Sequence, residues 1–374
     1  HIEPMENQVR IRFRVDGVLH EAMRHDIGLH AALIARIKIV SGLDISEKRR
    51  PQDGRATSIV DRQEYDIRVS ILPTVYGEKV VMRLAQKKAL TMDKRDLGFP
   101  DDELEKFNRI LSHPNGLILV TGPTGSGKTT TLYSVLQYLS SRLVNIVTIE
   151  DPVERNLPKI NQIQVNDRAG LNFQTGLRSI LRQDPDIIMI GETRDPETAE
   201  ISARAAITGH LVFSTLHTND AASSVTRLMD MGIPAYLAAA SIAGIVSQRL
   251  MRKVCPYCQE EYEARPEELK ILYGKPAAPG EHVRLRRGKG CYLCNETGYK
   301  GRIAIHEILS VDAEMKRMIS EGRKEDELKA YAIRSHGMTT LKEEAVKMVL
   351  AGITTFEEME RLVYTIDMDY FGED

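Results

Sequence analysis

A phosphate-binding loop constrains the fold of this chain more than any other feature. The stretch GPTGSGKTTTLYSVL begins at Gly122, directly after the apolar run LILV. It matches the pattern G-x-x-x-x-G-K-[ST], in which glycines let backbone N–H groups close around phosphates at the start of a helix. An apolar strand precedes the loop and a helical pattern follows it. The chain is therefore predicted to contain a P-loop α/β domain that binds a nucleoside triphosphate.

The residues assigned to phosphate binding are those of the loop and the first helical turn. The Lys128 ammonium would reach the β- and γ-phosphates, and the Thr129 hydroxyl would ligate Mg²⁺. A glycine-rich turn without a ligand is the alternative, and it is disfavoured because strand, motif and helix are in register. The predicted ATP-binding residues are Gly122, Pro123, Thr124, Gly125, Ser126, Gly127, Lys128, Thr129 and Thr130.

Four apolar segments predict the strands of this domain. GLILVT, NIVTIE, DIIMIGE and HLVFSTLH are separated by helical patterns, which is typical of a parallel sheet covered on both faces. The carboxyl ends of parallel strands share one edge, so Glu192 and Glu150 are expected beside the phosphate loop. We assign Glu192 to the Mg²⁺ shell or a polarised water, and Glu150 to water orientation or general-base catalysis. A solvated strand-end acid is the alternative for Glu192, as helix capping is for the neighbouring Asp151.

Two histidines frame the last of these strands, in TGHLVFSTLHTND. His210 precedes the strand and His217 ends it, so on a regular strand the two side chains face opposite sides. His217 is the better candidate to sense a γ-phosphate, because it lies at the carboxyl end. A lone histidine in an apolar strand is usually structural, and only the surrounding motifs favour a functional role.

Changes of pattern along the chain predict two domains followed by two further regions. The N-terminal part alternates apolar and charged side chains, the middle has the P-loop pattern, and the last part is helical after a segment dominated by cysteines. Residues 86–98 are charged and aperiodic, and they are predicted to link the first two domains. The expected limits are 1–97 for a small α+β domain, 98–251 for the ATP-binding core, 252–301 for the cysteine segment and 302–374 for the helical region.

Three local patterns allow more detailed predictions. QVRIRFRV has the period of a half-buried strand with a cationic outer face, and Asp16-Gly17 after it favours a hairpin turn. The helix that follows is expected to end near Gly42. The run AYLAAASIAGIV from Ala235 is too short to cross a bilayer and rich in small residues, which favours a packed helix.

The cysteines form two pairs, CPYC and CYLC, separated by 32 residues. Two C-x₂-C pairs can close around one tetrahedral Zn²⁺, with RPEELKILYG inserted between them as a loop or helix. CPYC alone would also suit a thiol oxidoreductase, but the second pair favours structural zinc. Four thiols in a chain of this length indicate a reducing compartment rather than a disulfide scaffold. The predicted zinc ligands are Cys255, Cys258, Cys291 and Cys294.

Charge and aromatic content argue against nucleic acid as a partner. The formal net charge is −2, there is no Trp, and aromatic residues make up 5% of the chain. Neither a basic groove nor a base-stacking platform is therefore indicated. The chain begins with His1 rather than Met, and we expect it to be a fragment without its natural N-terminus.

The motifs together resemble a known family. GPTGSGKT, TIEDPVE, LRQDPDIIMIGETRD and TGHLVFSTLHTND occur in this order and resemble the Walker A, Asp box, Walker B and His box of secretion ATPases. HIEP at the start and the tetracysteine segment narrow the resemblance to the type II secretion and type IV pilus assembly ATPases, over essentially the whole chain. The chain departs from the family pattern in two ways. Family members usually have a further domain before HIEP, and Thr193 stands where an aliphatic residue is common.

This resemblance implies a homohexamer in which a RecA-like domain binds ATP with Mg²⁺. A PAS-like small domain would contribute arginines to the nucleotide, and arginines of the Walker B region would complete the charge clamp. The family is cytoplasmic, peripheral to the inner membrane, and acts on a membrane platform protein. The matching arginines are Arg55, Arg50 and Arg14 in the small domain, and Arg178, Arg182 and Arg194 in the Walker B region.

The leading hypothesis for function is a mechanochemical ATPase. Closure of the small domain over the nucleotide would produce a rigid-body rotation, and the family resemblance implies that such rotations assemble pilin subunits through the platform protein. A nucleic-acid translocase, and a zinc-ribbon binding protein that uses ATP as a switch, are the alternatives. Retraction ATPases of this superfamily generally lack the tetracysteine segment, which favours outward assembly. We favour type IV pilus assembly over type II secretion.

Overall fold

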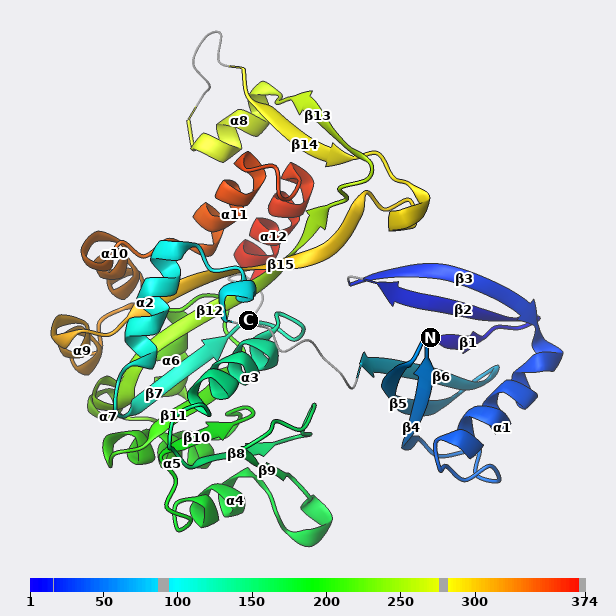
Figure 1. Ribbon diagram of the computed structural model, residues 1–374, viewed down its shortest axis with the longest axis horizontal. Coiled ribbons are helices and arrows are strands. Elements are labelled where there is room, and N and C mark those ends of the chain that lie inside the picture. The colour runs from blue at the N-terminus through cyan, green and yellow to red at the C-terminus, as the bar shows by residue number, and fades with distance from the viewer. Residues whose placement is uncertain (16, 87–93, 276–281, 370–374) are drawn as a thin grey trace. The chain divides into compact units, whose positions relative to one another are not determined.

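The structure is a computed structural model that describes residues 1–15, 17–86, 94–275 and 282–369. The chain divides into two units, His1–Thr91 and Met92–Asp374, which Figure 1 draws from blue to red. Asp16 of the predicted hairpin turn and residues 87–93 of the predicted linker lie outside the described residues.

The first unit contains a six-stranded antiparallel sheet with the order β3-β2-β1-β6-β5-β4. In β2, Val9 is fully buried while Arg10 and Arg12 pair with Glu3 of β1 at 3.2 and 2.8 Å. The predicted buried face of QVRIRFRV is thus confirmed only at its start, because Phe13 and Val15 at the end of the strand are exposed. The strands are β1 (Ile2–Pro4), β2 (Gln8–Val15), β3 (Val18–Asp26), β4 (Gln52–Val60), β5 (Gln63–Thr74) and β6 (Gly77–Gln86).

One helix, α1 (His30–Val40), covers part of this sheet after the short turn η1 (Ile27–Leu29). Gly42, with φ of +67°, follows the helix at the position where the sequence predicts its end. The core of the unit is small and apolar, and the buried polar residues of the unit include an ion pair between Lys38 and Glu78 at 2.7 Å. The predicted small α+β domain is confirmed. Its core residues are Ile2, Val9, Ile34, Val69, Ile71 and Val80.

The second unit is built on a seven-stranded sheet with the order β15-β12-β7-β11-β10-β8-β9. Every neighbouring pair is parallel except β12 with β15, which is antiparallel. The predicted α/β fold with a parallel-sheet core is confirmed. The strands are β7 (Gly116–Thr121), β8 (Ile146–Glu150), β9 (Asn161–Gln164), β10 (Ile187–Ile190), β11 (Leu211–Leu216), β12 (Ile242–Val254) and β15 (Tyr299–Ser310).

Helices cover both faces of this sheet, because successive residues of each strand point to opposite sides. In β7, Leu117 and Leu119 join a core with α4–α7, α9 and α10, while Ile118 and Val120 join a core with α2 and α3. Among the described residues, no helix has the length and apolar character needed to cross a membrane. The helices are α2 (Asp101–Leu111), α3 (Lys128–Leu139), α4 (Phe173–Ile180), α5 (Pro196–Ile207), α6 (Ser223–Asp230), α7 (Ala235–Ser241), α9 (Ala313–Ser320) and α10 (Glu325–His336).

A third core lies where β12 and β15 extend beyond the other strands. It is covered by α8 (Pro266–Tyr273), α11 (Leu341–Leu350) and α12 (Phe356–Asp369), and by a ribbon of β13 (Gln259–Glu263) and β14 (Arg284–Gly288). The segment RPEELKILYG between the cysteine pairs contains α8, as expected for an inserted helix.

Two sequence predictions about this unit are wrong. AYLAAASIAGIV is not one helix, because α7 ends at Ser241 and β12 begins at Ile242, where the chain pairs with β7. The region after residue 301 is not helical throughout, because β15 runs to Ser310 and pairs with β12. In both cases pairing with a strand distant in sequence decides the structure.

Candidate functional site

Glycines give the loop after β7 a backbone that other residues rarely adopt. Gly122, Gly125 and Gly127 have φ of +138°, +82° and +90°. A Cβ added at Gly122 would lie 2.4 Å from the Gln248 carbonyl oxygen, so side chains are excluded there. The loop leads directly into α3 at Lys128, which brings backbone N–H groups and the helix dipole to one place. This cradle fits the phosphates of a nucleotide.

Lys128 provides the positive charge of the loop. Its ammonium donates to the Gly122 and Pro123 carbonyl oxygens at 2.7 and 3.0 Å, and the residue is buried. Burial and the nearby Arg249 lower the pKa of Lys128 to about 8, although Glu192 opposes them. A partly desolvated ammonium of this kind gains most from an anionic ligand.

Glu192, Arg194 and His217 surround Lys128 at the carboxyl edge of the sheet. Glu192 accepts a hydrogen bond from Arg194 Nε at 2.6 Å. Burial, Lys128 and Arg194 lower the pKa of His217, and Glu192 opposes this shift. The parallel register of β10 and β11 brings these residues together, as expected from the sequence. Around them, Pro123, Thr124, Gly125, Thr129 and Thr130 are exposed and Ser126 is buried.

Glu150 lies at the end of β8, but its carboxylate is engaged elsewhere. It accepts a short hydrogen bond from the Tyr133 hydroxyl, and further bonds from Thr148 at 2.6 Å and Gln162 at 3.0 Å. The residue is buried. The structure therefore ties Glu150 to α3 and β9, and its role in water orientation stays a prediction.

His210 does not belong to the group around Lys128, and its grouping with His217 needs correction. Its Nδ1 lies 3.0 Å from the Ala205 carbonyl oxygen, and its own carbonyl accepts from Gly116 at the start of β7. The phosphate loop follows the other end of β7, about 20 Å away at roughly 3.3 Å per residue. The parallel register thus separates the two histidines.

The remaining predicted arginines differ in their surroundings. Arg178 pairs with Glu197 of α5 at 2.7 Å, and Arg182 donates to the Arg178 carbonyl at 2.9 Å. Arg14, Arg50 and Arg55 are exposed side chains of the first unit.

Two residues that sequence reasoning missed support the loop from β12. Gln248 donates to the Ser126 carbonyl at 2.6 Å and accepts from Thr131 at 2.7 Å. The neighbouring Arg249 points to the other side, where it donates to Asn219 in the loop after β11. Ser247 pairs with Thr121, so these side chains reach the level of the phosphate loop. Their only sequence signal is a Gln-Arg pair that follows an apolar run from Ile242 to Val246.

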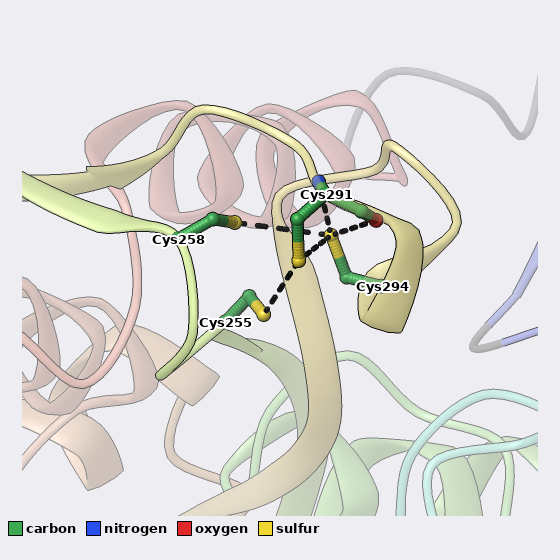
Figure 2. Close-up of side chains that lie close together, drawn as sticks. All are labelled: Cys255, Cys258, Cys291 and Cys294. Carbon is green, nitrogen blue, oxygen red and sulfur yellow. Dashed lines mark hydrogen bonds between the residues drawn. The ribbon is translucent and has the colours of Figure 1, made fainter.

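The four cysteines meet as predicted (Figure 2). Their sulfur atoms lie within 4.8 Å of one another, with separations of 4.0 Å for Cys255–Cys291, 3.8 Å for Cys258–Cys294 and 3.7 Å for Cys291–Cys294. Zn–S bonds of about 2.3 Å require sulfur separations of about 3.8 Å in a tetrahedral site. The arrangement fits Zn²⁺, whereas a disulfide needs sulfurs about 2.05 Å apart.

Backbone N–H groups stabilise the thiolate form of one of these cysteines. Cys294 Sγ accepts from the Cys291 and Gly298 backbone N–H groups at 3.2 and 3.3 Å. Burial raises its pKa, but these and other hydrogen bonds outweigh burial and lower the pKa to about 6. The thiolate is the form that ligates zinc.

Comparison with known proteins places this chain among secretion and pilus proteins. The family described as "Type II/IV secretion system protein" matches residues 1–361. Type IV pilus assembly ATPase PilB of Thermus thermophilus is 49% identical over 96% of this chain and 40% of its own length. Type II secretion system protein HxcR of Pseudomonas aeruginosa is 48% identical over 97% of this chain and 73% of its own length.

A solved structure agrees with this result. The crystal structure of the pilus retraction motor PilT with bound ADP is 26% identical, covers 95% of this chain and 90% of its own, and has a TM-score of 0.62. With a family match over residues 1–361 and relatives nearly half identical over almost its whole length, this chain belongs to the family of type II/IV secretion system proteins.

Proposed function

We propose that this chain is the motor part of an ATPase that hydrolyses ATP to assemble pilin or pseudopilin subunits. The main support is the convergence of Lys128, Glu192 and His217 at a glycine loop that fits phosphates. Relatives named as pilus assembly ATPases and type II secretion proteins match nearly the whole chain, which connects this site with subunit assembly.

The residues of the site have distinct roles in this proposal. The loop N–H groups and Lys128 bind the β- and γ-phosphates, and Thr129 holds Mg²⁺, which neutralises phosphate charge. Glu192 polarises the attacking water or supports the metal shell, and His217 senses the γ-phosphate. Arg194, held by Glu192, is released toward the phosphates when the nucleotide binds.

The architecture of the motor follows from the family. We propose a homohexamer, located in the cytoplasm at the inner membrane, that turns a membrane platform protein without using nucleic acid. Arg55, Arg50 and Arg14 of the first unit contact the nucleotide, and Arg178 and Arg182 complete its charge clamp. The cysteine cluster holds Zn²⁺ for a structural purpose, since four sulfur ligands leave no position open for chemistry.

Two carboxylates compete for the catalytic role, and a pair of isosteric variants separates them. Glu192→Gln should lower kcat for ATP hydrolysis by about a hundredfold or more while leaving ATP binding intact. Glu150→Gln should cause the same loss of kcat only if Glu150 of the wild type leaves Tyr133 and orients the attacking water when the small domain closes over the nucleotide. Phosphate release by the purified hexamer, with and without its platform protein, is the measurement.

The outcomes also separate the alternative functions. Absence of phosphate release from the wild type under all these conditions would refute the motor and leave an ATP switch. Turnover that rises with DNA and falls with salt would instead indicate a translocase.

We further propose type IV pilus extension as the process served. Relatives from type IV pilus assembly and from type II secretion match this chain about equally well. Because sequence similarity does not separate the two processes, the test is genetic. Deleting the gene in its host should remove surface pili. Loss of exported hydrolases with pili retained would assign the chain to type II secretion instead.

A further inference from the structure

The loop that carries His217 is held by elements far along the chain. This loop comprises residues 217–222, between the end of β11 at Leu216 and the start of α6 at Ser223. Arg249 of β12 donates to both the backbone and the side-chain oxygen of Asn219 at 3.2 Å. Lys329 of α10 donates to Asp220 at 2.7 Å. The loop therefore depends on contacts with residues 30 to 109 positions later.

Asp220 is the centre of these contacts. Its side chain is 2% exposed; one oxygen accepts from the Ser223 backbone N–H at 2.8 Å, and the other faces the Lys329 ammonium. A buried carboxylate needs a counter-charge, since an unpaired charge in such a site costs several kcal/mol. Burial raises the pKa of Asp220, but Lys329 and the local hydrogen bonds outweigh this effect and lower it.

A second acid makes Asp220 more dependent on Lys329. Glu307 of β15 is 1% exposed and accepts from the backbone N–H groups of Ala221 at 2.8 Å and Leu341 at 3.2 Å. Burial and the Asp220 charge raise the pKa of Glu307 to about 7. Lys329 thus attracts both acids, and removing it would take this counter-charge away from Asp220. Movement of Asp220 toward water would lower the resulting cost, and the loop that carries Asp220 would move with it.

We propose that Lys329 is a positioning residue for the nucleotide site, which fixes the His217 loop by holding Asp220. Lys329 lies on α10, outside every motif by which the family is recognised. Loss of the contact between Lys329 and Asp220 would then change the geometry at the γ-phosphate. The catalytic consequence rests on the function proposed above, whereas the placement of His217 does not.

The test compares Lys329→Met with two further variants. Lys329→Arg keeps the charge and should restore the contact. Lys106→Met is the matched control: Lys106 also lies 2.7 Å from a buried acid, Glu103, and it donates to the Gly337 carbonyl directly after α10. The control therefore loosens α10 without touching Asp220.

The first readout needs no nucleotide. His217 is modified with diethyl pyrocarbonate across a pH series, with His210 in the same tryptic peptide, 205–227, as an internal reference. Lys128 helps to lower the pKa of His217 in the wild type. In Lys329→Met the midpoint of modification should rise toward the ordinary value of about 6.5, and in Lys329→Arg and Lys106→Met it should not.

The second readout is ATP hydrolysis. Lys329→Met should lower kcat about three- to thirtyfold with a smaller change in KM, and Lys329→Arg should recover most of the loss. If Lys329→Met does not fold, Lys329→Gln replaces it with the same expected shift, because it also removes the charge that holds Asp220. An unchanged His217 midpoint, or the same shift in Lys106→Met, would overturn the inference. A wild type without turnover would refute the proposed function while the pH series still decides the placement of His217.

Discussion

Lys128 shows how the surroundings of one residue set its chemistry. Its ammonium is capped by two loop carbonyls and lies near Arg249 in a site that excludes most water. These conditions destabilise the protonated form of Lys128 when no ligand is bound. Phosphate oxygens would replace the carbonyls and stabilise the charge. Binding and protonation of Lys128 are therefore linked.

This linkage predicts that ATP affinity depends on pH. With a pKa of about 8 in the free protein and a higher one beside phosphate, Lys128 is protonated before and after binding below pH 8. Above pH 8 binding must take up a proton, so affinity should fall by up to about tenfold per pH unit. Titration with a fluorescent ATP analogue from pH 6.5 to 9.5 measures this. Lys128→Arg should abolish the slope, and a flat wild-type profile would contradict the prediction.

Glu307 gives a second prediction, for stability. Its pKa of about 7 in the folded protein exceeds the unfolded value of 4.5, so between these pH values the folded state keeps a proton that the unfolded chain releases. The free energy of unfolding should then fall as pH rises through this window, by at most about 1.4 kcal/mol per unit. Glu307→Gln should lack this contribution and gain stability relative to the wild type between pH 5 and pH 8. Urea unfolding of both proteins at pH 5 and pH 8 tests this. A difference in unfolding free energy between the two proteins that is the same at both pH values would contradict the prediction.

At the level of the site, the sequence predicts the placement of a residue where a local motif fixes it, while the roles assigned to these residues stay predictions. The loop predicts Lys128, and strand ends predict Glu192 and His217, because parallel strands share an edge. Gln248 and Arg249 were missed because only the pairing of β12 with β7 brings them to the loop. His210 belongs to the same sequence motif as His217, but the strand between them places the two residues at opposite ends of β11.

Among secondary-structure elements, the boundary between α7 and β12 was the hardest to predict. Small apolar residues favour a helix, but Ile242, Ile245 and Val246 are β-branched and join the central sheet. No glycine or proline marks the change at Ser241. By contrast, Pro100 and the acids after it mark the start of α2 in the sequence itself, since such end signals are local.

The cysteine cluster is an element whose order should depend on metal. It joins the end of β12 to the turn before β15, and the β13–β14 ribbon emerges from it. We expect one Zn²⁺ per chain, lost in Cys258→Ser, with faster hydrogen exchange over residues 255–300 and little change in ATP binding. Tyr257→Ala, an exposed change inside the same pair, should keep the metal. Elemental analysis with hydrogen exchange measures both, and metal retained by Cys258→Ser would contradict the assignment.

In the whole molecule, the first unit contributes a set of arginines with different surroundings. Arg10 and Arg12 are held by Glu3 and so support the sheet. Arg55 is exposed on β4, where it pairs in register with Arg68 of β5. Its exposure leaves the Arg55 guanidinium accessible to a ligand, which suits the role that the family resemblance assigns to it.

Arg55→Ala should therefore lower kcat for ATP hydrolysis by at least about tenfold while ATP still binds to the loop of the second unit. The control is Arg24→Ala, which removes an exposed arginine of the same unit that pairs with Glu21 at 2.6 Å.

Mixing Arg55→Ala subunits with Lys128→Ala subunits then shows whether Arg55 acts on the nucleotide of its own subunit or on that of a neighbour. Activity recovered in mixed rings means that Arg55 acts on a neighbour's nucleotide, because one protomer can supply the arginine and the other the intact loop. Activity that stays at the level of the separate variants means that it acts within its own chain, because no subunit then has both groups. Equal rates for Arg55→Ala and Arg24→Ala would remove Arg55 from the mechanism.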